Sequence, residues 1–334
     1  MHLSIIIVNY KTPQLTIDCL KTIYEQTKNI DFEVIVVDND SKDDSKERIC
    51  TAFPRIAWLQ MDYNAGFARA NNAAIRQSRG EVILLLNSDT LNIDNTIGNC
   101  FELFAASEYV ACGVQLLNPD GSPQISGNYF MRGGLNHLLP LPYVGNFIKW
   151  LGTALSVKKP NIPDATSETE VDWINGAFLM VKRNAINKAG LMDEDFFLYA
   201  EEAEWCARLK KVGRLCIYGQ FKVIHLQGAT TTIAFQSSEK GYYNLYNKKG
   251  LQITLSNMIR VRKQFGVFWF LFQLVIFTFT IPVFFIFSFL ENLFRLRNPF
   301  HDFGLAGGFT KNVLKVWSYA AVIISNKPYF YKVL

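Results

Sequence analysis

The sequence lacks the cysteine patterns that hold a zinc ion or a disulfide framework. Its six cysteines are scattered, with no CxxC pair and no histidine-rich partner motif. This spacing argues against a zinc site and against a disulfide scaffold, and it fits a reducing compartment. No charged segment and no cleavage site precede the first strand pattern, so we expect no secretory signal.

The first strand-to-helix turn contains no glycine. It consists of Asn-Tyr-Lys-Thr-Pro over residues 9–13. Dinucleotide-binding folds and P-loops need glycines at this turn, because the backbone must approach the phosphates closely. A nucleotidyltransferase or a dinucleotide-dependent enzyme on a similar sheet is therefore disfavoured. The sequence also has no internal repeat and no low-complexity run.

Charge is unevenly distributed along the chain. Residues 254–334 contain nine Lys and Arg but two Asp and Glu, a net charge of +7, whereas residues 1–253 carry −2. The basic segment surrounds a long apolar stretch, which binding to nucleic acid does not require. An anionic membrane surface is the better partner for it, and we expect no nucleic acid partner.

The apolar stretch covers residues 265–290, which are 26 residues without a charge, ten of them phenylalanine. About 20 apolar residues are enough for a helix to cross a bilayer. Basic residues flank both ends, however, and Pro282 near the middle can kink a helix. We therefore favour a re-entrant or interfacial helical pair on the cytoplasmic leaflet over a single span. A buried core helix or an oligomer interface is the remaining alternative.

The most informative run is Leu84–Asp89, an apolar strand that ends in a polar turn and a carboxylate. A strand without polar residues is typical of the buried middle of a parallel sheet. Ligands of such sheets bind beyond the carboxyl ends of the strands. Asp89 can hold a divalent cation there, because Mg²⁺ and Mn²⁺ prefer oxygen ligands. Taken alone, a turn-capping role explains Asp89 equally well.

Strands and helices alternate through the first part of the chain. We expect strands at residues 3–8, 34–37, 56–60 and 82–86, and helices at residues 14–26, 45–53 and 66–77. This alternation predicts an α/β fold with a mostly parallel central sheet and flanking helices. Parallel neighbours would bring the polar strand ends at Asn9, Asp38 and Asn87 to one edge of the sheet.

The second part of the chain begins with an irregular segment. Residues 118–170 are rich in proline and glycine, so we expect loops here that shape the acceptor side of a cleft. Order returns with a strand at residues 171–181, a helix at residues 201–212 and a strand at residues 215–218. On that helix Glu204 and Arg208 are four residues apart, so they can form an ion pair.

Several motifs in this order resemble the inverting family-2 glycosyltransferases, which have a GT-A (Rossmann-like) fold. They lie at residues 4–10, 36–41, 64–72 and 86–89, and in the second half at residues 173–177 and 195–202 with Arg208. Within that family they resemble the rhamnosyltransferase-like branch that builds bacterial surface polysaccharides. The resemblance covers about residues 3–250. It implies transfer of a sugar from a nucleoside diphosphate to an acceptor hydroxyl, with inversion.

The resemblance assigns the nucleotide-sugar side of the site to the ends of the first strands. Asp38 would accept the pyrimidine imide N–H, an acidic donor that suits a carboxylate, and Tyr10 would stack beside the base. The other residues implied on this side are Val8, Asn9, Asn39, Asn64, Asn71, Asn87 and Ser88. Many relatives carry arginine at the position of Asn71. Residues 38–41 would also suit an Asx turn that caps the following helix.

The resemblance also implies a divalent cation, Mg²⁺ or Mn²⁺, bound by Asp89 with His225 nearby. Negative charge grows on the leaving diphosphate, and a cation stabilises that charge. Family members usually carry a further acid where this chain has Asn87, so the implied metal site is weaker. For His225 a structural role stays open, as for any single histidine.

On the acceptor side the resemblance makes Glu202 the general base, at a position where relatives usually have aspartate. A base there takes the proton of the acceptor hydroxyl. Glu201, Gly176 and Ala177 belong to the same side, and Trp173 and Tyr199 are candidates for stacking on a sugar face. The alternatives are favourable charge at a helix start for the two glutamates and core packing for the two aromatic residues.

Together these inferences predict two regions and one reaction. Residues 1–253 would form the catalytic domain, with a nucleotide-sugar half at 1–117 and an acceptor half at 118–253, and residues 254–334 a membrane-associated helical region. We expect transfer of a sugar from a dTDP-, UDP- or GDP-sugar to a lipid-linked saccharide at the cytoplasmic face of the inner or plasma membrane. The resemblance to the rhamnosyltransferase-like branch is what implies rhamnose as this sugar. The alternative is a catalytically inactive membrane-bound adaptor. Monomer and homo-oligomer stay equally open.

Overall fold

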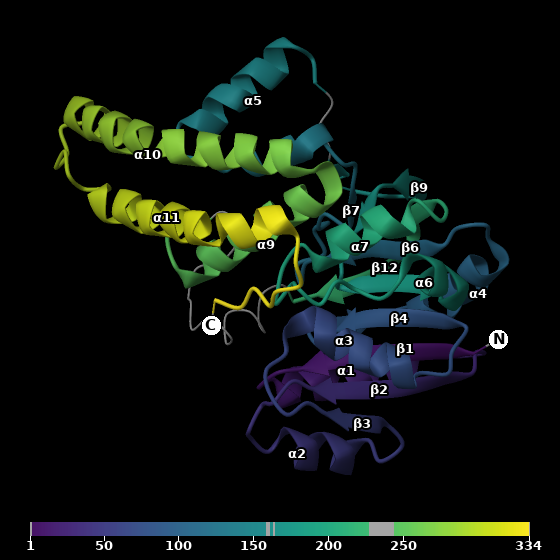
Figure 1. Cartoon of the computed structure of the whole chain (residues 1–334). Helices are drawn as coiled ribbons and strands as arrows, with labels where there is room; N and C mark the ends of the chain where they lie inside the picture. The colour runs from purple at the N-terminus through teal and green to yellow at the C-terminus, as the bar shows by residue number, and fades with distance from the viewer. Residues whose placement is uncertain (1, 158–160, 163, 227–243, 334) are drawn as a thin grey trace. The chain divides into compact units, whose positions relative to one another are not determined.

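The computed structural model describes residues 2–157, 161–162, 164–226 and 244–333 (Figure 1). The chain divides into two compact units. The sheet unit comprises Met1–Tyr129, Asn161–Phe197 and Glu201–Ser238, and the helical unit comprises Phe130–Pro160, Leu198–Ala200 and Glu239–Leu334.

Within the described residues the sheet unit contains a nine-stranded mixed sheet. Its spatial order is β3-β2-β1-β4-β11-β6-β12-β5, with β9 paired to β12. The strands are β1 (Leu3–Asn9), β2 (Phe32–Asp38), β3 (Ala57–Gln60), β4 (Val82–Asn87), β5 (Thr90–Asn92), β6 (Ala111–Leu117), β9 (Glu168–Val171), β11 (Phe178–Lys182) and β12 (Leu215–His225). β3, β2, β1 and β4 are parallel to one another, and β11 runs antiparallel between β4 and β6. The predicted α/β fold with a mostly parallel central sheet is confirmed.

A second, small sheet and six helices are the other elements that the described residues of the sheet unit form. The small sheet has the order β10-β7-β8, formed by β10 (Trp173–Ile174), β7 (Gly127–Asn128) and β8 (Asn161–Ile162). The helices are α1 (Pro13–Gln26), α2 (Ser45–Ala52), α3 (Gly66–Gln77), α4 (Thr96–Ala106), α6 (Arg183–Ala189) and α7 (Glu201–Leu209). Helix α1 starts at Pro13, whose missing N–H costs nothing in the first turn. In α7 the predicted ion pair forms, with Arg208 Nη2 2.7 Å from Glu204 Oε2.

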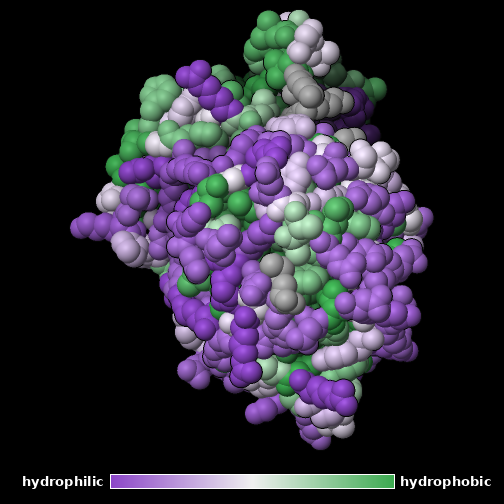
Figure 2. All heavy atoms as spheres, turned by 90° about the vertical axis from the view of Figure 1, so that its right-hand side faces the viewer, coloured by the Kyte–Doolittle hydropathy of each residue, from purple (hydrophilic) through white to green (hydrophobic). Residues whose placement is uncertain are grey.

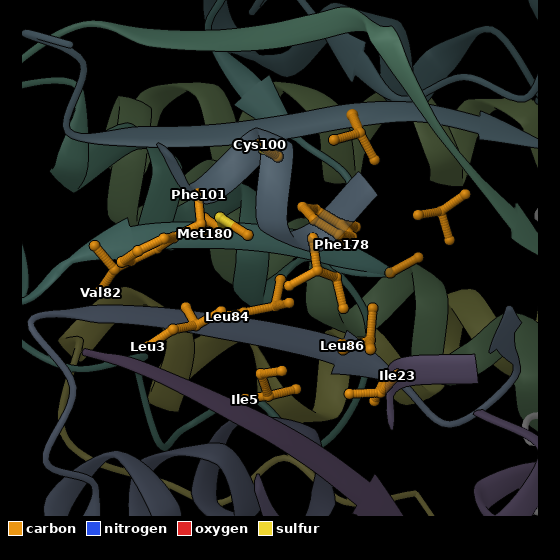
Figure 3. Close-up of a cluster of buried hydrophobic side chains, with 14 of the residues drawn as sticks. Leu3, Ile5, Ile23, Val82, Leu84, Leu86, Cys100, Phe101, Phe178 and Met180 are labelled. Atoms are coloured by element: carbon orange, nitrogen blue, oxygen red, sulfur yellow. The ribbon is translucent and has the colours of Figure 1, made fainter. Parts of the chain in front are cut away.

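The core of the sheet unit explains why its central strands are mostly apolar. Leu84 of β4 and Met180 of β11 point to the same face, where they meet Phe101 of α4 (Figure 3). Alternate residues point to the opposite face, and Leu85 of β4 is fully buried there as well. A strand covered on both faces must be apolar along most of its length. The middle and lower part of the face drawn in Figure 2 is mostly hydrophilic, with single hydrophobic side chains among hydrophilic ones, whereas hydrophobic side chains gather at the top of the view.

The structure differs from the sequence prediction at three places in this unit. The pattern analysis assigns nothing to residues 90–117, where β5, α4 and β6 lie. Residues 171–181 do not form one strand, because a turn around Gly176 separates β10 from β11. The strand predicted at residues 215–218 continues to His225 as β12, with a register shift between Tyr218 and Lys222. That extension places His225 opposite Thr90.

The helical unit consists of η1 (Arg132–Leu138), α5 (Val144–Ala154), α9 (Lys248–Phe265), α10 (Val267–Phe294) and α11 (Phe303–Ser325). Helix α10 is a single 28-residue helix that continues through Pro282, so the predicted break into a helical pair does not occur. Among the described helices α10 is the one long and apolar enough to cross a membrane, by length and composition alone.

Helix α10 packs inside the helical unit through one side and leaves many aromatic side chains exposed. Phe277 stacks on Phe309 of α11, and Gln273 Nε2 donates to the carbonyl oxygen of Gly133 at 2.6 Å. The side chains of Phe268 and Phe279 are 70% and 59% exposed. An exposed aromatic row on so apolar a helix is a surface that water does not favour.

Candidate active site

The sheet brings the three predicted polar strand ends to one edge. Asn9 lies opposite Asp38 in the β1–β2 register, and Val8 lies opposite Asn87 in the β1–β4 register. This juxtaposition was predicted from the alternation of strands and helices, and it is confirmed. Tyr10 follows β1 directly and is half-buried at the same edge.

The carboxylate of Asp38 is the best-satisfied polar group at this edge. Its Oδ1 accepts hydrogen bonds from Asn9 Nδ2 at 2.7 Å and from Ser41 Oγ at 2.5 Å. Its Oδ2 accepts from the Ser41 backbone N–H at 3.0 Å and from Gln60 Nε2 at 2.8 Å. A carboxylate offers about four acceptor positions, so all of them are used. Asn9 and Ser41 are buried, whereas Gln60 is exposed.

The asparagines predicted to contact nucleotide organise the turns around it. Asn39 Oδ1 accepts from the Ala65 backbone N–H at 2.8 Å, and Asn39 Nδ2 donates to Asn64 Oδ1 at 3.0 Å. Asn71 Nδ2 donates to the carbonyl oxygen of Phe67 within α3. These bonds tie the end of β2 to the start of α3. Contact of Asn39, Asn64 and Asn71 with a nucleotide stays a prediction.

The turn after β4 carries Ser88 and Asp89, both nearly fully buried. Asp89 Oδ1 lies 3.3 Å from Nε2 of His225, which is also buried. Asn87 Nδ2 lies 3.5 Å from the same ring nitrogen. One carboxylate oxygen and one imidazole nitrogen therefore face each other at the edge where a diphosphate is predicted. Oxygen and imidazole donors of this kind suit Mn²⁺, and oxygen donors suit Mg²⁺.

These two side chains do not form a closed metal site. Among residues 2–157, 161–162, 164–226 and 244–333 there is no group of three or more His, Cys, Asp or Glu side chains able to hold a metal ion. The donor set fits a cation that takes its remaining ligands from diphosphate oxygens and water, as Mg²⁺ does in many nucleotide sites.

The β10–β11 turn lies beside the Asn87 turn. The Asn87 backbone N–H donates to the carbonyl oxygen of Ala177 at 3.1 Å. At Gly176 a Cβ atom would lie 3.6 Å from Cγ of Glu202, so the Glu202 side chain rests against this glycine. Residues 176 and 177 of this turn thus lie next to the predicted base on one side and to the Asn87–Asp89 turn on the other. Trp173 of β10 is half-buried and Ala177 is buried.

The two glutamates at the start of α7 have different surroundings. Glu201 is buried, and its Oε2 makes no hydrogen bond to any part of the chain that the structure describes. Burial and the neighbouring Glu202 carboxylate raise the pKa of Glu201 well above its ordinary value. Glu202 is half-buried. A partly accessible carboxylate is what a base must be to reach a hydroxyl group.

Tyr199, the remaining predicted residue, belongs to the helical unit. It is buried, and its φ of +72° is unusual for a residue with a side chain. The backbone next to it is fixed by Ser256 Oγ, which donates to the carbonyl oxygen of Leu198 at 2.8 Å. Its stacking role stays a prediction, as do the roles of the other candidate residues.

Gln60 and Gln124 were not predicted as site residues from the sequence. Gln60 occupies an acceptor position of Asp38, and Gln124 Oε1 lies 2.9 Å from Nδ1 of His225. Both partners are distant along the chain, and glutamine belongs to none of the motifs. The spacing of hydrophobic residues carries no signal for such bonds.

The family follows from comparison with known proteins. Residues 4–167 match the family described as glycosyl transferase family 2. The chain is 29% identical to a low-salt glycan biosynthesis hexosyltransferase of Haloferax volcanii, over 74% of each chain. It is 27% identical to an N-acetylglucosaminyl-diphospho-decaprenol L-rhamnosyltransferase of Mycobacterium tuberculosis, over 59% of this chain and 67% of that one. We therefore assign the chain to glycosyl transferase family 2.

A solved structure supports the fold. A mannosyltransferase from Pyrobaculum calidifontis, solved with GDP-Man and Mn²⁺, superposes with a TM-score of 0.52 at 15% identity. The match covers 94% of this chain and 86% of that one. The expected GT-A fold, with helices flanking a mostly parallel sheet, is thereby confirmed. The enzyme is a glycosyltransferase with relatives in polysaccharide biosynthesis.

Proposed function

We propose that this glycosyltransferase transfers a sugar from a nucleoside diphosphate to a hydroxyl group of a lipid-linked saccharide, with inversion at the anomeric carbon. The observation that carries the proposal is the place of the β10–β11 turn, where the Ala177 carbonyl oxygen accepts from the Asn87 backbone N–H and Gly176 lies next to Glu202. This turn brings the predicted donor edge next to the predicted base.

On the donor side, Asp38 would accept the imide N–H of a pyrimidine base, while Tyr10 stacks beside it. Asn9 is fully buried and donates to Asp38, which keeps the carboxylate aimed at the edge. The diphosphate would lie at the Asn87–Asp89 turn. Asp89 and His225 would hold a divalent cation there, and that cation would stabilise the charge of the departing diphosphate.

On the acceptor side, Glu202 would remove the proton from the acceptor hydroxyl. The hydroxyl oxygen then forms a bond to the anomeric carbon on the face opposite the diphosphate. The bond from that carbon to the diphosphate oxygen breaks, and the nucleoside diphosphate leaves with the electron pair. Because one displacement occurs, the configuration inverts. Gly176 has no side chain, so the Glu202 side chain can lie close to the backbone of the β10–β11 turn.

The nature of the acceptor and the membrane contact are inferred from relatives and from the helical unit. A relative named for a decaprenol-linked acceptor supports a lipid-linked saccharide, and the same name supports rhamnose as the sugar. We propose that residues 254–334, with the apolar helix α10, hold the enzyme at the cytoplasmic face of the membrane, while residues 1–253 carry out the transfer.

The substitution Glu202→Gln tests the proposed base. It keeps the shape of the side chain and removes its basicity, so we expect kcat to fall about 10²- to 10⁴-fold, with little change in donor binding. The control is Glu47→Gln, a glutamate exposed in the first turn of α2. Transfer within twofold of the unchanged enzyme would remove Glu202 from the base role.

The competing adaptor function makes a different prediction. An inactive adaptor would bind nucleoside diphosphates without cleaving any donor. Purified protein should be incubated with dTDP-, UDP- and GDP-sugars, with and without Mn²⁺, and released nucleotide measured. Cleavage of one donor that depends on Glu202 supports the enzyme, and binding without cleavage of any donor supports the adaptor.

A further inference from the structure

We propose that Gln124 is a positioning residue that fixes the protonated nitrogen of His225 and thereby makes the other ring nitrogen a metal ligand. The proposal rests on the divalent cation of the proposed function. It concerns a residue that lies in the irregular segment and belongs to none of the recognised motifs. Gln124, His225 and Asp89 are all nearly fully buried.

The orientation of the Gln124 amide group is set by its surroundings. Its Nε2 lies 2.7 Å from the carbonyl oxygen of His225, 3.3 Å from that of Leu117 and 2.8 Å from Asn118 Oδ1. Backbone carbonyl groups can only accept hydrogen bonds. The amide nitrogen must therefore face them, and the amide oxygen must face the imidazole ring.

This orientation determines where the neutral ring carries its proton. Gln124 Oε1 lies 2.9 Å from Nδ1 of His225, and an amide oxygen can only accept. Nδ1 is therefore the protonated nitrogen. The lone pair of Nε2 then points at Asp89 Oδ1, 3.3 Å away. In the neutral ring these two acceptors repel at this distance, and a divalent cation bound by both atoms would turn the repulsion into attraction.

Gln124 is itself held in place along its backbone. Its N–H donates to the carbonyl oxygen of Leu116 at 2.8 Å, and its own carbonyl oxygen accepts from Gln115 Nε2 at 2.8 Å. Ser126 Oγ donates to the same oxygen at 3.1 Å. The edge of β6 thus anchors the residue that orients the histidine. Partners of this kind typically change metal affinity 10- to 100-fold when they are removed.

The test compares two substitutions at one position. Gln124→Met keeps the length of the side chain and removes its hydrogen bonds. Gln124→Glu keeps an oxygen that can accept from Nδ1, also when its carboxylate is ionised at alkaline pH. Gln77→Met makes the same exchange at an exposed residue of α3 and serves as the control.

Two measurements are made on the full-length protein. The first is ¹⁵N NMR of the ring nitrogens at alkaline pH, which is readable because the chain has four histidines. The second is Mn²⁺ affinity by electron paramagnetic resonance. We expect the unchanged protein and Gln124→Glu to keep the proton of His225 on Nδ1. Gln124→Met should shift it toward Nε2 and weaken Mn²⁺ binding about 10-fold or more.

Failure of this proposal can be distinguished from failure of the proposed function. If Gln124→Met keeps the Nδ1 proton and binds Mn²⁺ within twofold of the unchanged protein, the role of Gln124 is overturned while the cation and the transfer stand. If the unchanged protein transfers sugar but binds no Mn²⁺ at His225, the cation site is overturned and the role of Gln124 falls with it.

Discussion

At the scale of single residues, the hydrogen bonds of Asp38 bear on the proposed contact of this carboxylate with a nucleotide base. All of its acceptor positions are in use, so an incoming imide N–H must displace one donor. Asn9 and Ser41 are buried, whereas Gln60 is exposed and can turn away. We therefore predict that an imide N–H bound at Asp38 takes the place of the Gln60 amide.

The substitution Gln60→Ala should tighten the binding of UDP or dTDP. The nucleotide base then no longer competes with the Gln60 amide for Asp38. The hydrogen bond that is lost is partly exposed and accepted by a carboxylate, so it corresponds to about 1 kcal/mol, or roughly fivefold in Kd. Isothermal titration calorimetry measures this, with Gln77→Ala as the control. Weaker binding in Gln60→Ala would show that Gln60 contacts the nucleotide instead of competing with it.

The raised pKa of Glu201 predicts how stability depends on pH. The folded protein retains a proton on Glu201 above pH 4.5, the ordinary value, whereas the unfolded chain releases it. The contribution of this group to stability is therefore complete below that pH and is lost as the pH rises toward the raised pKa of the folded state, by at most about 1.4 kcal/mol per pH unit.

Glu201→Gln removes this dependence. The stability of the variant relative to the unchanged protein should increase between pH 5.5 and pH 8, as measured by urea unfolding at both values. Glu47→Gln, at an exposed site, should show no such trend. A constant difference between Glu201→Gln and the unchanged protein would mean that Glu201 is ionised in the folded state throughout this range.

The sequence allowed some of these residues to be placed and not others. Asn9, Asp38 and Asn87 could be brought together because parallel strands share one edge. Gln124 could not be predicted, because its partner is 101 residues away and the bond depends on where β12 ends. Hydrogen bonds between distant side chains follow from tertiary structure, and the local spacing of hydrophobic residues gives no information about them.

At the scale of elements, the start of α3 depends on a glycine. Gly66 has φ of +77°, and a Cβ atom there would overlap the carbonyl oxygen of Phe197. That oxygen also accepts from the Phe67 backbone N–H at 2.9 Å. The contact ties the nucleotide-side helix to the segment that leads to Glu201 and Glu202.

Gly66→Ala should destabilise the protein by about 2–5 kcal/mol, since it combines an unfavourable φ with a steric overlap. Gly121→Ala is the matched control. Its φ of +81° is similar, but nothing lies within 4 Å of a Cβ atom there, so we expect a cost of about 1–2 kcal/mol. Urea unfolding measures both. If both variants lose the same free energy of unfolding, the backbone conformation alone explains why residue 66 is a glycine.

The missed elements have a physical explanation. Residues 90–117 contain a three-residue strand and two segments rich in apolar residues, α4 and β6. A short apolar segment suits a buried helix and a buried strand equally well, so periodicity does not separate them. Helix α10 was predicted to break at Pro282, yet packing of Phe277 and Phe284 against Phe309 supports a continuous helix.

At the scale of the whole molecule, the exposed side chains of α10 predict membrane binding. Changing Phe268, Phe279 and Ile286 to serine removes apolar area that is more than half exposed. Each buried side chain of this size corresponds to about 1.5–3 kcal/mol, so association with anionic vesicles should weaken at least 100-fold. Flotation on a density gradient measures it, and carbonate extraction distinguishes a spanning helix from an interfacial one.

The matched control is the triple change of Tyr63, Leu103 and Ile125 to serine. These side chains of the sheet unit are 46%, 40% and 39% exposed. Unchanged vesicle binding is expected for this variant. If both triple variants float like the unchanged protein, α10 does not mediate the membrane contact.

The antiparallel strand β11 has a consequence for how this protein is made. It lies between β4 and β6, so β4 gains its second neighbour only when a segment about 90 residues further along has left the ribosome. At translation speeds of about 5–20 residues per second, that delay is roughly 5–20 s. During this time β4, which is apolar from Val82 to Leu86, has an unpaired edge, a template for aggregation. We expect the nascent chain to need a chaperone in this interval, and expression of residues 1–117 alone to give insoluble material.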